Sequence, residues 1–321
     1  MPHVSRRALL QSSSLIGMGI LSACTPTPDP ADARRDTTAA VEDRYGAGTY
    51  NTQEVADELH YIQKNVRAIE EGKGRRILIT GSTAGLGQLA AAHLLTRGHR
   101  VVAHARNDRR AADVRRDLPD LESVVTGELT DLDQTRALAS QINELGAFDV
   151  IIHNAGEYGL SGEKMLHANS ISPYLLTALI DAHAHLIYLT SDLHLNGDLA
   201  LDELRSGGTD ITYDDSKLQV LTLAMAVARR RPGVRVNAVA PGWVPTLMGF
   251  HNGPYAPDNL REGYMTQVWL AEGIERSSQI TGEFFFHQEP ESNVHASVRD
   301  TTAQDELLRA YEDRTGVPLG S

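Results

Sequence analysis

An alternation of short apolar runs with helical patterns predicts an α/β protein built on a doubly wound parallel sheet, with helices on both faces. Seven apolar runs recur from Arg76 onward, and segments with helical periodicity separate most of them. The glycine-rich stretch from Gly81 to Gly87 follows the first run and opens directly into a helical pattern, which predicts a strand, a tight turn and a helix. The seven runs cover residues 77–80, 101–104, 123–126, 150–153, 186–190, 234–239 and 283–287.

Length, charge and cysteine content narrow the class of protein. A chain of 321 residues, 41% of them hydrophobic, can bury a sizeable core. The formal net charge of -12 at pH 7 argues against a nucleic-acid partner, because phosphate binding needs a concentrated basic patch. The single cysteine excludes an intramolecular disulfide. We therefore expect a globular domain that is held together by its apolar core.

The first 24 residues differ from the rest of the chain. Ser5-Arg6-Arg7 precede a moderately apolar stretch that ends in Leu21-Ser22-Ala23-Cys24. This pattern resembles a twin-arginine export signal that ends in a bacterial lipobox, whose cysteine is lipid-modified and becomes the mature N-terminus. We therefore expect residues 1–24 to direct export, and Cys24 to anchor the protein to a membrane, facing the periplasm or the cell exterior. The alternative is a cytoplasmic protein with a frayed extension or an early start codon.

A tether and an extra N-terminal helix precede the sheet. Residues 25–50 contain prolines and small polar residues without apolar periodicity, which is typical of a flexible tether. Asn51 and Glu54 have the spacing of a capping box, so we expect a helix over about 52–71 within a segment 51–74. Its apolar stripe most simply covers a core edge, and partner binding is the alternative. The stripe consists of Val55, Leu59, Ile62, Val66 and Ile69.

The glycine-rich turn is the first candidate binding site. Gly81 and Gly85 would let backbone N–H groups approach a pyrophosphate, and Gly87 would let the helix pack close to the strand. The helix N-terminus adds its partial positive charge. An ordinary turn is the alternative interpretation, because closely spaced glycines also occur in turns without a ligand.

Two further strand ends complete the candidate nucleotide site. Arg106, after the second strand, can pair with the 2′-phosphate of NADP, so we expect NADP in preference to NAD. Arg109 and Arg110 are candidate helpers, and in the alternative interpretation all three arginines only solvate a helix start. The small residues Asn154-Ala155-Gly156 would let the backbone lie along the adenosine, although alone they would pass as a turn.

The candidate chemistry lies around the fifth strand and the next helix. Tyr213 and Lys217 stand at i and i+4, on one face of a helix. An ammonium group close to a phenol favours the phenolate and lowers its pKa, so Tyr213 could act as a general acid or base near neutrality. Ser191, at the end of the fifth strand, could hydrogen-bond a substrate oxygen. The alternative is an ordinary exposed helix that carries a tyrosine and a lysine.

Six ordered motifs between Arg76 and Phe286 resemble the short-chain dehydrogenase/reductase superfamily. They are Thr80-Gly81-Ser82-Thr83-Ala84-Gly85-Leu86-Gly87, Asn154-Ala155-Gly156, Asn169, Ser191, Tyr213-x-x-x-Lys217 and Pro241-Gly242-Trp243-Val244-Pro245-Thr246. The resemblance implies hydride transfer between the nicotinamide of NADP and a carbonyl or secondary alcohol. The segment 75–290 would form this domain, and 291–321 a tail with a closing helix.

The resemblance also implies a role for each catalytic residue. Tyr213 would pass the proton, Ser191 would hold the substrate oxygen, and Lys217 would bind the nicotinamide ribose while lowering the pKa of Tyr213. Asn169 would hold a water that extends the proton relay to Lys217. The implied cofactor-binding residues are Gly81, Ser82, Thr83, Gly85, Leu86, Gly87, Arg106, Asn107, Glu128, Leu129, Asn154, Ala155, Gly156, Tyr213, Lys217, Pro241, Gly242, Val244 and Thr246, with Thr246 on the carboxamide.

Three departures from the family pattern affect these expectations. Glu128-Leu129 replaces the usual aspartate at the adenine, and Ala84 replaces a basic residue that many NADP-specific members carry, which leaves Arg106 as the main source of NADP preference. The inserted segment 196–210 and Ser191-Asp192-Leu193-His194 resemble the retinol-dehydrogenase-like branch, which suggests a lipophilic or bulky carbonyl substrate.

Two functional classes are compatible with these motifs. The first is the enzyme, and the second is a non-catalytic NADP-binding sensor or scaffold; a complete set of four catalytic residues favours the enzyme. His183 and His185 have no evident third ligand, so no metal site is expected. The motifs name neither the substrate nor the direction of the reaction, and they leave the oligomeric state open, with a homo-oligomer as one option.

Overall fold

The computed structural model describes residues 50–70, 74–181, 183–253 and 255–320. Its centre is an eight-stranded sheet with the order β3-β2-β1-β4-β5-β6-β7-β8. All neighbouring strands pair in parallel except β7 and β8, which are antiparallel. The doubly wound parallel sheet expected from the sequence is therefore confirmed, and β8 is an addition that the apolar pattern did not predict. The strands are β1 (Arg76–Ile79), β2 (Arg100–Ala105), β3 (Ser123–Thr126), β4 (Phe148–His153), β5 (His183–Leu189), β6 (Arg235–Ala240), β7 (Glu283–Phe286) and β8 (Glu289–Pro290).

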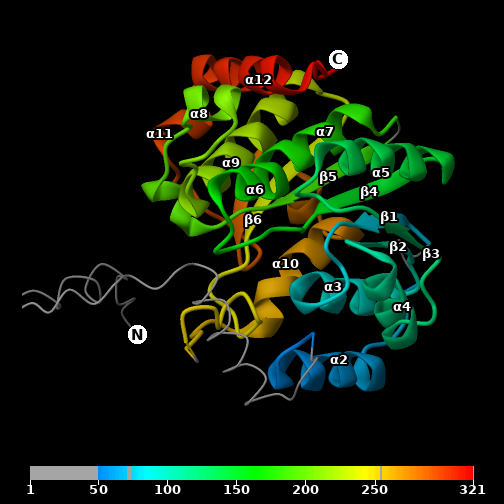
Figure 1. The fold of residues 1–321 in the computed structure, drawn as a ribbon. Helices are drawn as coiled ribbons and strands as arrows, with labels where there is room; N and C mark the ends of the chain where they lie inside the picture. The colour runs from blue at the N-terminus through cyan, green and yellow to red at the C-terminus, as the bar shows by residue number, and fades with distance from the viewer. Residues whose placement is uncertain (1–49, 71–73, 182, 254, 321) are drawn as a thin grey trace, which may run out of the picture.

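Helices cover both faces of the sheet (Figure 1). One face carries α3 (Gly85–Thr96), α4 (Asp108–Asp117) and α10 (Leu260–Glu272), whose apolar side chains form one core cluster with the sheet. The opposite face carries α5 (Leu132–Glu144), α6 (Gly162–Leu166), α7 (Ser172–Leu179) and α9 (Tyr213–Arg230) around a second cluster. An outer group closes that cluster on the side away from the sheet: α8 (Leu201–Ser206), α11 (Ala296–Arg299) and α12 (Thr301–Thr315).

The strands are apolar almost throughout because both faces of a parallel sheet are buried. Ile77, Leu78 and Ile79 of β1 are fully buried, as are Val101 and Val102 of β2. β1 lies between β2 and β4, so the chain reverses its winding direction at this point. Ligands of doubly wound sheets bind beyond the carboxyl ends of the strands at such a switch point, which directs attention to the loops after β1 and β4.

The helix α2 (Gln53–Asn65) lies beneath α3 and α10 as an additional layer (Figure 1). The sequence pattern predicts a helix over about 52–71, whereas α2 ends at Asn65, about six residues earlier. The expected capping box is wrong, because Thr52 is the N-cap and its side chain accepts a hydrogen bond from the Val55 amide. Asn51 instead contacts α3. Val55 and Ile62 are fully buried against the core, as the apolar stripe indicated.

The C-terminal helix α12 closes the opposite face. Leu307 and Tyr311, one turn apart, are fully buried. The Tyr311 hydroxyl lies 2.6 Å from the Ser170 hydroxyl, and its ring stacks on Tyr174 at a centroid distance of 4.5 Å. This helix therefore belongs to the domain core rather than to a separate tail. Within the described residues, no helix has the length and apolar character to cross a membrane.

Candidate active site

The turn after β1 contacts the loop after β4 so closely that only glycine fits at two positions. A Cβ on Gly81 would lie 2.8 Å from the Ala155 Cα, and one on Gly87 would lie 2.6 Å from the Gly81 carbonyl oxygen. Gly81 and Gly85 also have positive φ angles of +63° and +57°, which L side chains rarely adopt. The loop after β4 is joined to the turn by hydrogen bonds as well. The Asn154 amide donates to the Thr80 and Gly81 carbonyls at 2.9 and 3.2 Å.

This turn has the features that a pyrophosphate needs. Ala84, the N-cap of α3, provides no side-chain hydrogen bond to the first helical turn, and the Gly85 amide donates instead to the Asn51 side chain at 2.8 Å. Leu86, in the first turn of α3, is partly buried and packs against one of the two apolar core clusters. The residues present therefore fit a dinucleotide, with the first turn of α3 as its phosphate-binding element.

Ser82 and Thr83 hold the turn in place through contacts within the protein. The Ser82 hydroxyl is fully buried, donates to the Ile79 carbonyl at 2.8 Å and accepts from the His104 amide at 3.0 Å. The Thr83 carbonyl accepts a hydrogen bond from the Arg110 guanidinium at 2.8 Å. These two residues therefore shape the turn, and their side-chain and carbonyl oxygens are directed to β1, β2 and α4.

His104 is a functional residue that the sequence pattern did not single out. Its Nδ1 accepts a hydrogen bond from the Gly81 amide at 3.0 Å, and its Nε2 lies 2.8 Å from the Gly127 carbonyl. An acceptor at Nδ1 and a donor at Nε2 define a neutral imidazole. Burial lowers the pKa of His104, which keeps the ring neutral. In the sequence, the only sign of these contacts is that a histidine stands in an apolar strand. A histidine that is buried there needs polar partners, so hydrogen bonds from its ring could have been expected.

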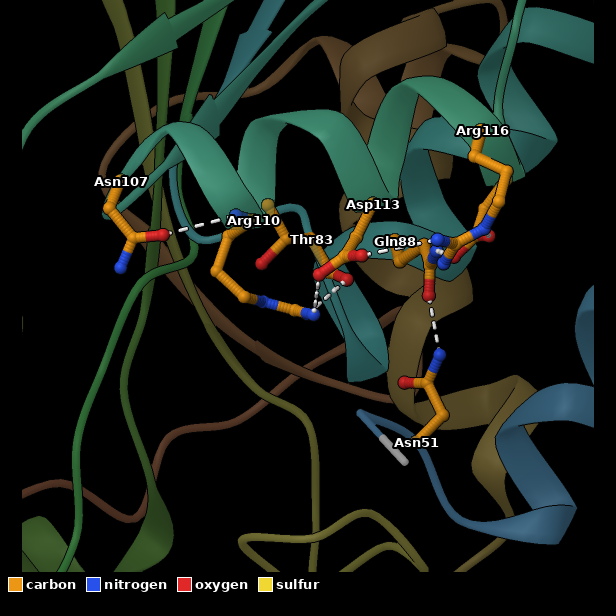
Figure 2. A network of polar contacts seen from close by, with 8 residues as sticks. Asn51, Thr83, Gln88, Asn107, Arg110, Asp113 and Arg116 are labelled. Carbon is orange, nitrogen blue, oxygen red and sulfur yellow. Dashed lines mark hydrogen bonds and ion pairs between the residues drawn. The ribbon is translucent and has the colours of Figure 1, made fainter. Parts of the chain in front are cut away.

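Two of the arginines after β2, Arg106 and Arg110, differ in their surroundings. Arg106 is exposed, whereas Arg110 is buried and hydrogen-bonded within the protein. Arg106 is 58% exposed at its side chain and lies 3.6 Å from a Glu157 carboxylate oxygen, so it can reach a bound phosphate. Arg110 is buried and cannot, since its guanidinium donates to Asp113 and Thr83 at 2.8 Å each (Figure 2). Asn107 caps α4 by accepting a hydrogen bond from the Arg110 amide at 3.0 Å. The candidate helper role of Arg110 in phosphate binding is therefore wrong.

Three candidate catalytic side chains meet where β5 ends and α9 begins. Tyr213 is the first residue of α9, directly after the N-cap Thr212, which forms a capping box with Asp215. Ser191 is a hydrogen-bonding neighbour of the Tyr213 phenol and lowers its pKa, which is the smallest of the effects on that group. The Lys217 ammonium lies 5.4 Å from the centre of the Tyr213 ring and donates to the Leu189 carbonyl at 3.2 Å. The i, i+4 spacing thus places lysine and tyrosine on the same helix face, as predicted.

The expected lowering of the Tyr213 pKa does not occur in this structure. Burial raises the pKa of Tyr213, and the nearby carboxylates of Asp214 and Asp192 raise it further. The main groups that shift this pKa do not include Lys217, whose ammonium donates to a backbone carbonyl. Burial also lowers the pKa of Lys217 to about 8. The phenol is therefore held in its protonated form at neutral pH.

Asn169 lies in a π-helical turn, η2 (His167–Ile171), between α6 and α7. Its side-chain amide exchanges hydrogen bonds with the Glu157 backbone, at 2.7 and 2.9 Å, and donates to the Ser216 hydroxyl at 3.0 Å. These contacts secure the loop after β4 against α9. Gly156, in that loop, approaches the Lys217 ammonium so closely that a Cβ would lie 3.2 Å from it. Asn169 and Gly156 are therefore brought together with Lys217.

The loop after β6 is bent by Gly242 and by Asp258. Gly242 has φ +83°, and the Trp243 amide donates to Asp258 at 2.6 Å. Val244 is buried, and the Thr246 hydroxyl accepts from the Gly249 amide at 3.1 Å. A Cβ on Gly85 would lie 3.7 Å from the Thr246 methyl group, so this loop faces the glycine-rich turn. Thr246 thus lies beside Gly85, and Pro241, Gly242 and Val244 precede it in the same loop.

The residues after β3 lie at the margin of the site. The Glu128 carboxylate accepts from the Thr130 amide at 3.1 Å, and the Leu129 carbonyl accepts from the Ser172 hydroxyl at 2.7 Å.

Across the part of the chain that the structure describes, no three histidine, cysteine or acidic side chains are placed to hold a metal ion. His185 is fully buried within β5, and its Nε2 lies 3.5 Å from the Asn237 amide.

The fold and the site define a dinucleotide-binding α/β protein with a serine, tyrosine and lysine set at the switch-point edge of its sheet. The chain matches the short chain dehydrogenase family model over residues 75–180. It is 38% identical to the short-chain dehydrogenase chry4 of Gibberella zeae over 260 residues, which cover 77% of this chain and 99% of that protein. The chain therefore belongs to the short-chain dehydrogenase family and is an oxidoreductase.

The chain is also similar to a retinol dehydrogenase and to a solved structure. Human retinol dehydrogenase 14 is 31% identical over 215 residues, which cover 56% of this chain and 64% of that protein. The chain therefore has retinol-dehydrogenase-like homologues. The solved structure of the RhlG/NADP active-site complex of Pseudomonas aeruginosa has a TM-score of 0.54 and 23% identity, over 67% of this chain and 97% of that one. At this identity the likeness shows a common fold.

Proposed function

We propose that the protein is an NADP(H)-dependent reductase of carbonyl compounds, with Tyr213 as the general acid and the corresponding secondary alcohol as the product. The observation that carries this proposal is the placement of Ser191 as a neighbour of the Tyr213 phenol, with the Lys217 ammonium 5.4 Å from the centre of the Tyr213 ring. Two hydroxyl groups that meet at one point can hold one carbonyl oxygen between them. When bound, the nicotinamide supplies a hydride to the carbonyl carbon.

Tyr213 donates the proton that completes the reduction. Because burial raises the pKa of Tyr213, the phenol is protonated at neutral pH and ready to donate to the oxygen that gains negative charge. Ser191 donates a hydrogen bond to the same oxygen and fixes the carbonyl plane. Lys217, whose pKa is lowered to about 8 by burial, would supply the proton that restores the phenol after each turnover.

Several features support NADP as the cofactor. Arg106 is an exposed cation immediately after β2, where the 2′-phosphate would lie. Asn107, which follows it, is neutral, whereas an acidic residue at the end of β2 would favour NAD. The Pseudomonas aeruginosa structure with the same fold is an NADP complex.

Exposed apolar side chains beside the site support a lipophilic substrate. Leu193 and Leu195 follow Ser191 closely in the chain and are 42% and 37% exposed. Trp243 and Tyr255, which meet edge to face, are 48% and 65% exposed near the loop that carries Thr246. Exposed apolar groups gathered beside a site indicate a surface that binds apolar ligands. We therefore propose a bulky apolar ketone or aldehyde as the substrate.

The proposed activity is tested by following NADPH absorbance with a panel of carbonyl compounds that ranges from small polar ketones to long-chain aldehydes. We expect NADPH consumption that increases with the apolar size of the substrate. A protein that binds NADPH but reduces none of the compounds would contradict the proposed substrate class, and a protein that binds neither NADPH nor NADH would contradict the proposed function itself.

We further propose that the protein is exported and anchored through Cys24. Arg6, Arg7 and Cys24 lie outside the described residues, so this proposal rests on the sequence pattern alone. The twin-arginine route moves folded proteins, so the nucleotide domain could carry its cofactor across the membrane. We expect the full chain in the membrane fraction and Cys24→Ala released from it. Full-length protein found in the cytoplasm would contradict the proposal and leave the enzymatic assignment intact.

A further inference from the structure

Residues 50–52 form a short strap that lies beside the candidate cofactor site and contacts three segments of it. The Tyr50 ring lies against the Arg110 guanidinium, 3.5 Å from centroid to carbon, at the α4 end. The Asn51 side chain reaches the glycine-rich turn in the middle. The Thr52 hydroxyl donates to the Pro245 carbonyl at 2.8 Å, beside Thr246. The strap therefore touches three segments that would enclose a dinucleotide.

The central contact of the strap is made by Asn51. Its Oδ1 accepts a hydrogen bond from the Gly85 amide at 2.8 Å, and its Nδ2 donates to the Gln88 side chain at 2.6 Å. Gln88 is fully buried and donates in turn to Asp117 at 3.0 Å, which joins the strap to α4. Figure 2 shows Asn51 below Gln88, with Thr83, Arg110 and Asp113 on the other side of the turn.

The strap is held from behind by α2. The Glu58 carboxylate forms a two-pronged ion pair with Arg261 of α10, at 2.7 and 2.9 Å, and accepts from the Tyr264 hydroxyl at 2.7 Å. Val55 and Ile62 are buried in the core below α3. Because α2 is fixed to α3 and α10 in this way, the Asn51 side chain approaches Gly85 from a defined direction.

The hydrogen bond from the Gly85 amide to Asn51 acts on the conformation of the glycine-rich turn. Its positive φ of +57° turns the chain into α3, whose own N-cap, Ala84, supplies no side-chain hydrogen bond. Asn51 supplies that missing acceptor from a segment 34 residues away in the sequence. The acceptor is a neutral amide, which satisfies the Gly85 amide without placing a negative charge beside the position that a pyrophosphate would take.

We propose that Asn51 is a positioning residue for the nicotinamide cofactor: it fixes the Gly85 turn for pyrophosphate binding, and its neutrality is required at that place. This inference rests on the proposed function, since it assumes that the turn binds a dinucleotide. Two requirements follow. The side chain must accept a hydrogen bond from the Gly85 amide, and it must carry no charge.

Two variants separate these requirements. Asn51→Ala removes both hydrogen bonds, so it should lower the melting temperature and raise the Kd for NADPH about threefold to tenfold. Asn51→Asp keeps an acceptor for Gly85, and a carboxylate at a helix N-terminus is favourable, so this variant should be more stable than Asn51→Ala. The charge of the aspartate should nevertheless repel the pyrophosphate and raise the Kd for NADPH by more than about tenfold over the wild-type value. Added salt should reduce this difference between variant and wild type, because it screens the repulsion.

The experiment measures the Kd for NADPH by fluorescence titration and the melting temperature of the full chain, for the wild type, the two Asn51 variants and Asn65→Ala. Asn65 is the matched control, because it lies at the exposed far end of α2, where its side chain donates to the Tyr61 carbonyl. The expected result is a crossed order, in which Asn51→Asp melts above Asn51→Ala but binds NADPH more weakly.

The outcomes are distinguishable. If both Asn51 variants bind NADPH as tightly as the wild type and Asn65→Ala, or if the Kd values simply follow the melting temperatures, Asn51 has only a structural role and the inference is wrong. If the wild type binds neither NADPH nor NADH, the proposed function is wrong, and the inference fails with it.

Discussion

Replacing Tyr213 by phenylalanine is expected to lower kcat for carbonyl reduction by about 10³-fold, while the Kd for NADPH stays within about twofold of the wild-type value. The variant removes one oxygen atom, the one that would donate the proton. The ring keeps its place at the start of α9, 5.0 Å from Tyr158 in an edge-to-face contact. The fold should therefore survive the change.

Steady-state kinetics with NADPH and an apolar carbonyl compound measures this effect. Tyr61→Phe is the matched control, because it removes the same atom from a tyrosine that is 43% exposed on α2. We expect that control to retain wild-type turnover. Undiminished turnover in Tyr213→Phe would show that another group supplies the proton and would overturn the assigned mechanism.

Replacing Arg106 by aspartate is expected to shift the ratio of NADP to NAD affinity by about 10²-fold toward NAD. The substitution removes an attraction to the 2′-phosphate and adds a repulsion, so two effects of the same sign combine. The side chain is 58% exposed and its ion pair with Glu157 spans 3.6 Å, so the change should cost little stability.

Titration of the wild type and the variant with NADPH and NADH measures the shift. Arg115→Asp is the control, because it makes the same change of charge at an exposed position near the far end of α4. We expect Arg115→Asp to keep most of the NADP preference. Equal affinities of the unmodified protein for NADPH and NADH would contradict the role assigned to Arg106.

The sequence by itself determined the parts of this protein that depend on local periodicity. Apolar runs such as 77–80 became strands because side chains buried on both faces of a parallel sheet must all be apolar. The spacing of Tyr213 and Lys217 placed both on one face of α9, since residues four apart on a helix are neighbours. The tight turn after the first strand could likewise be predicted from its glycines, because a positive φ and a close backbone approach both require glycine.

Only the tertiary structure decided the contacts between segments that are distant in the sequence. The Asn51 side chain looked like the cap of its own helix, but it caps α3, because packing of α2 against α3 and α10 brings it to Gly85. The pKa of Tyr213 was expected to fall near Lys217, yet burial and two neighbouring carboxylates raise it. Desolvation and long-range hydrogen bonds depend on which surfaces the folded chain covers, and a linear pattern of residues does not contain that information.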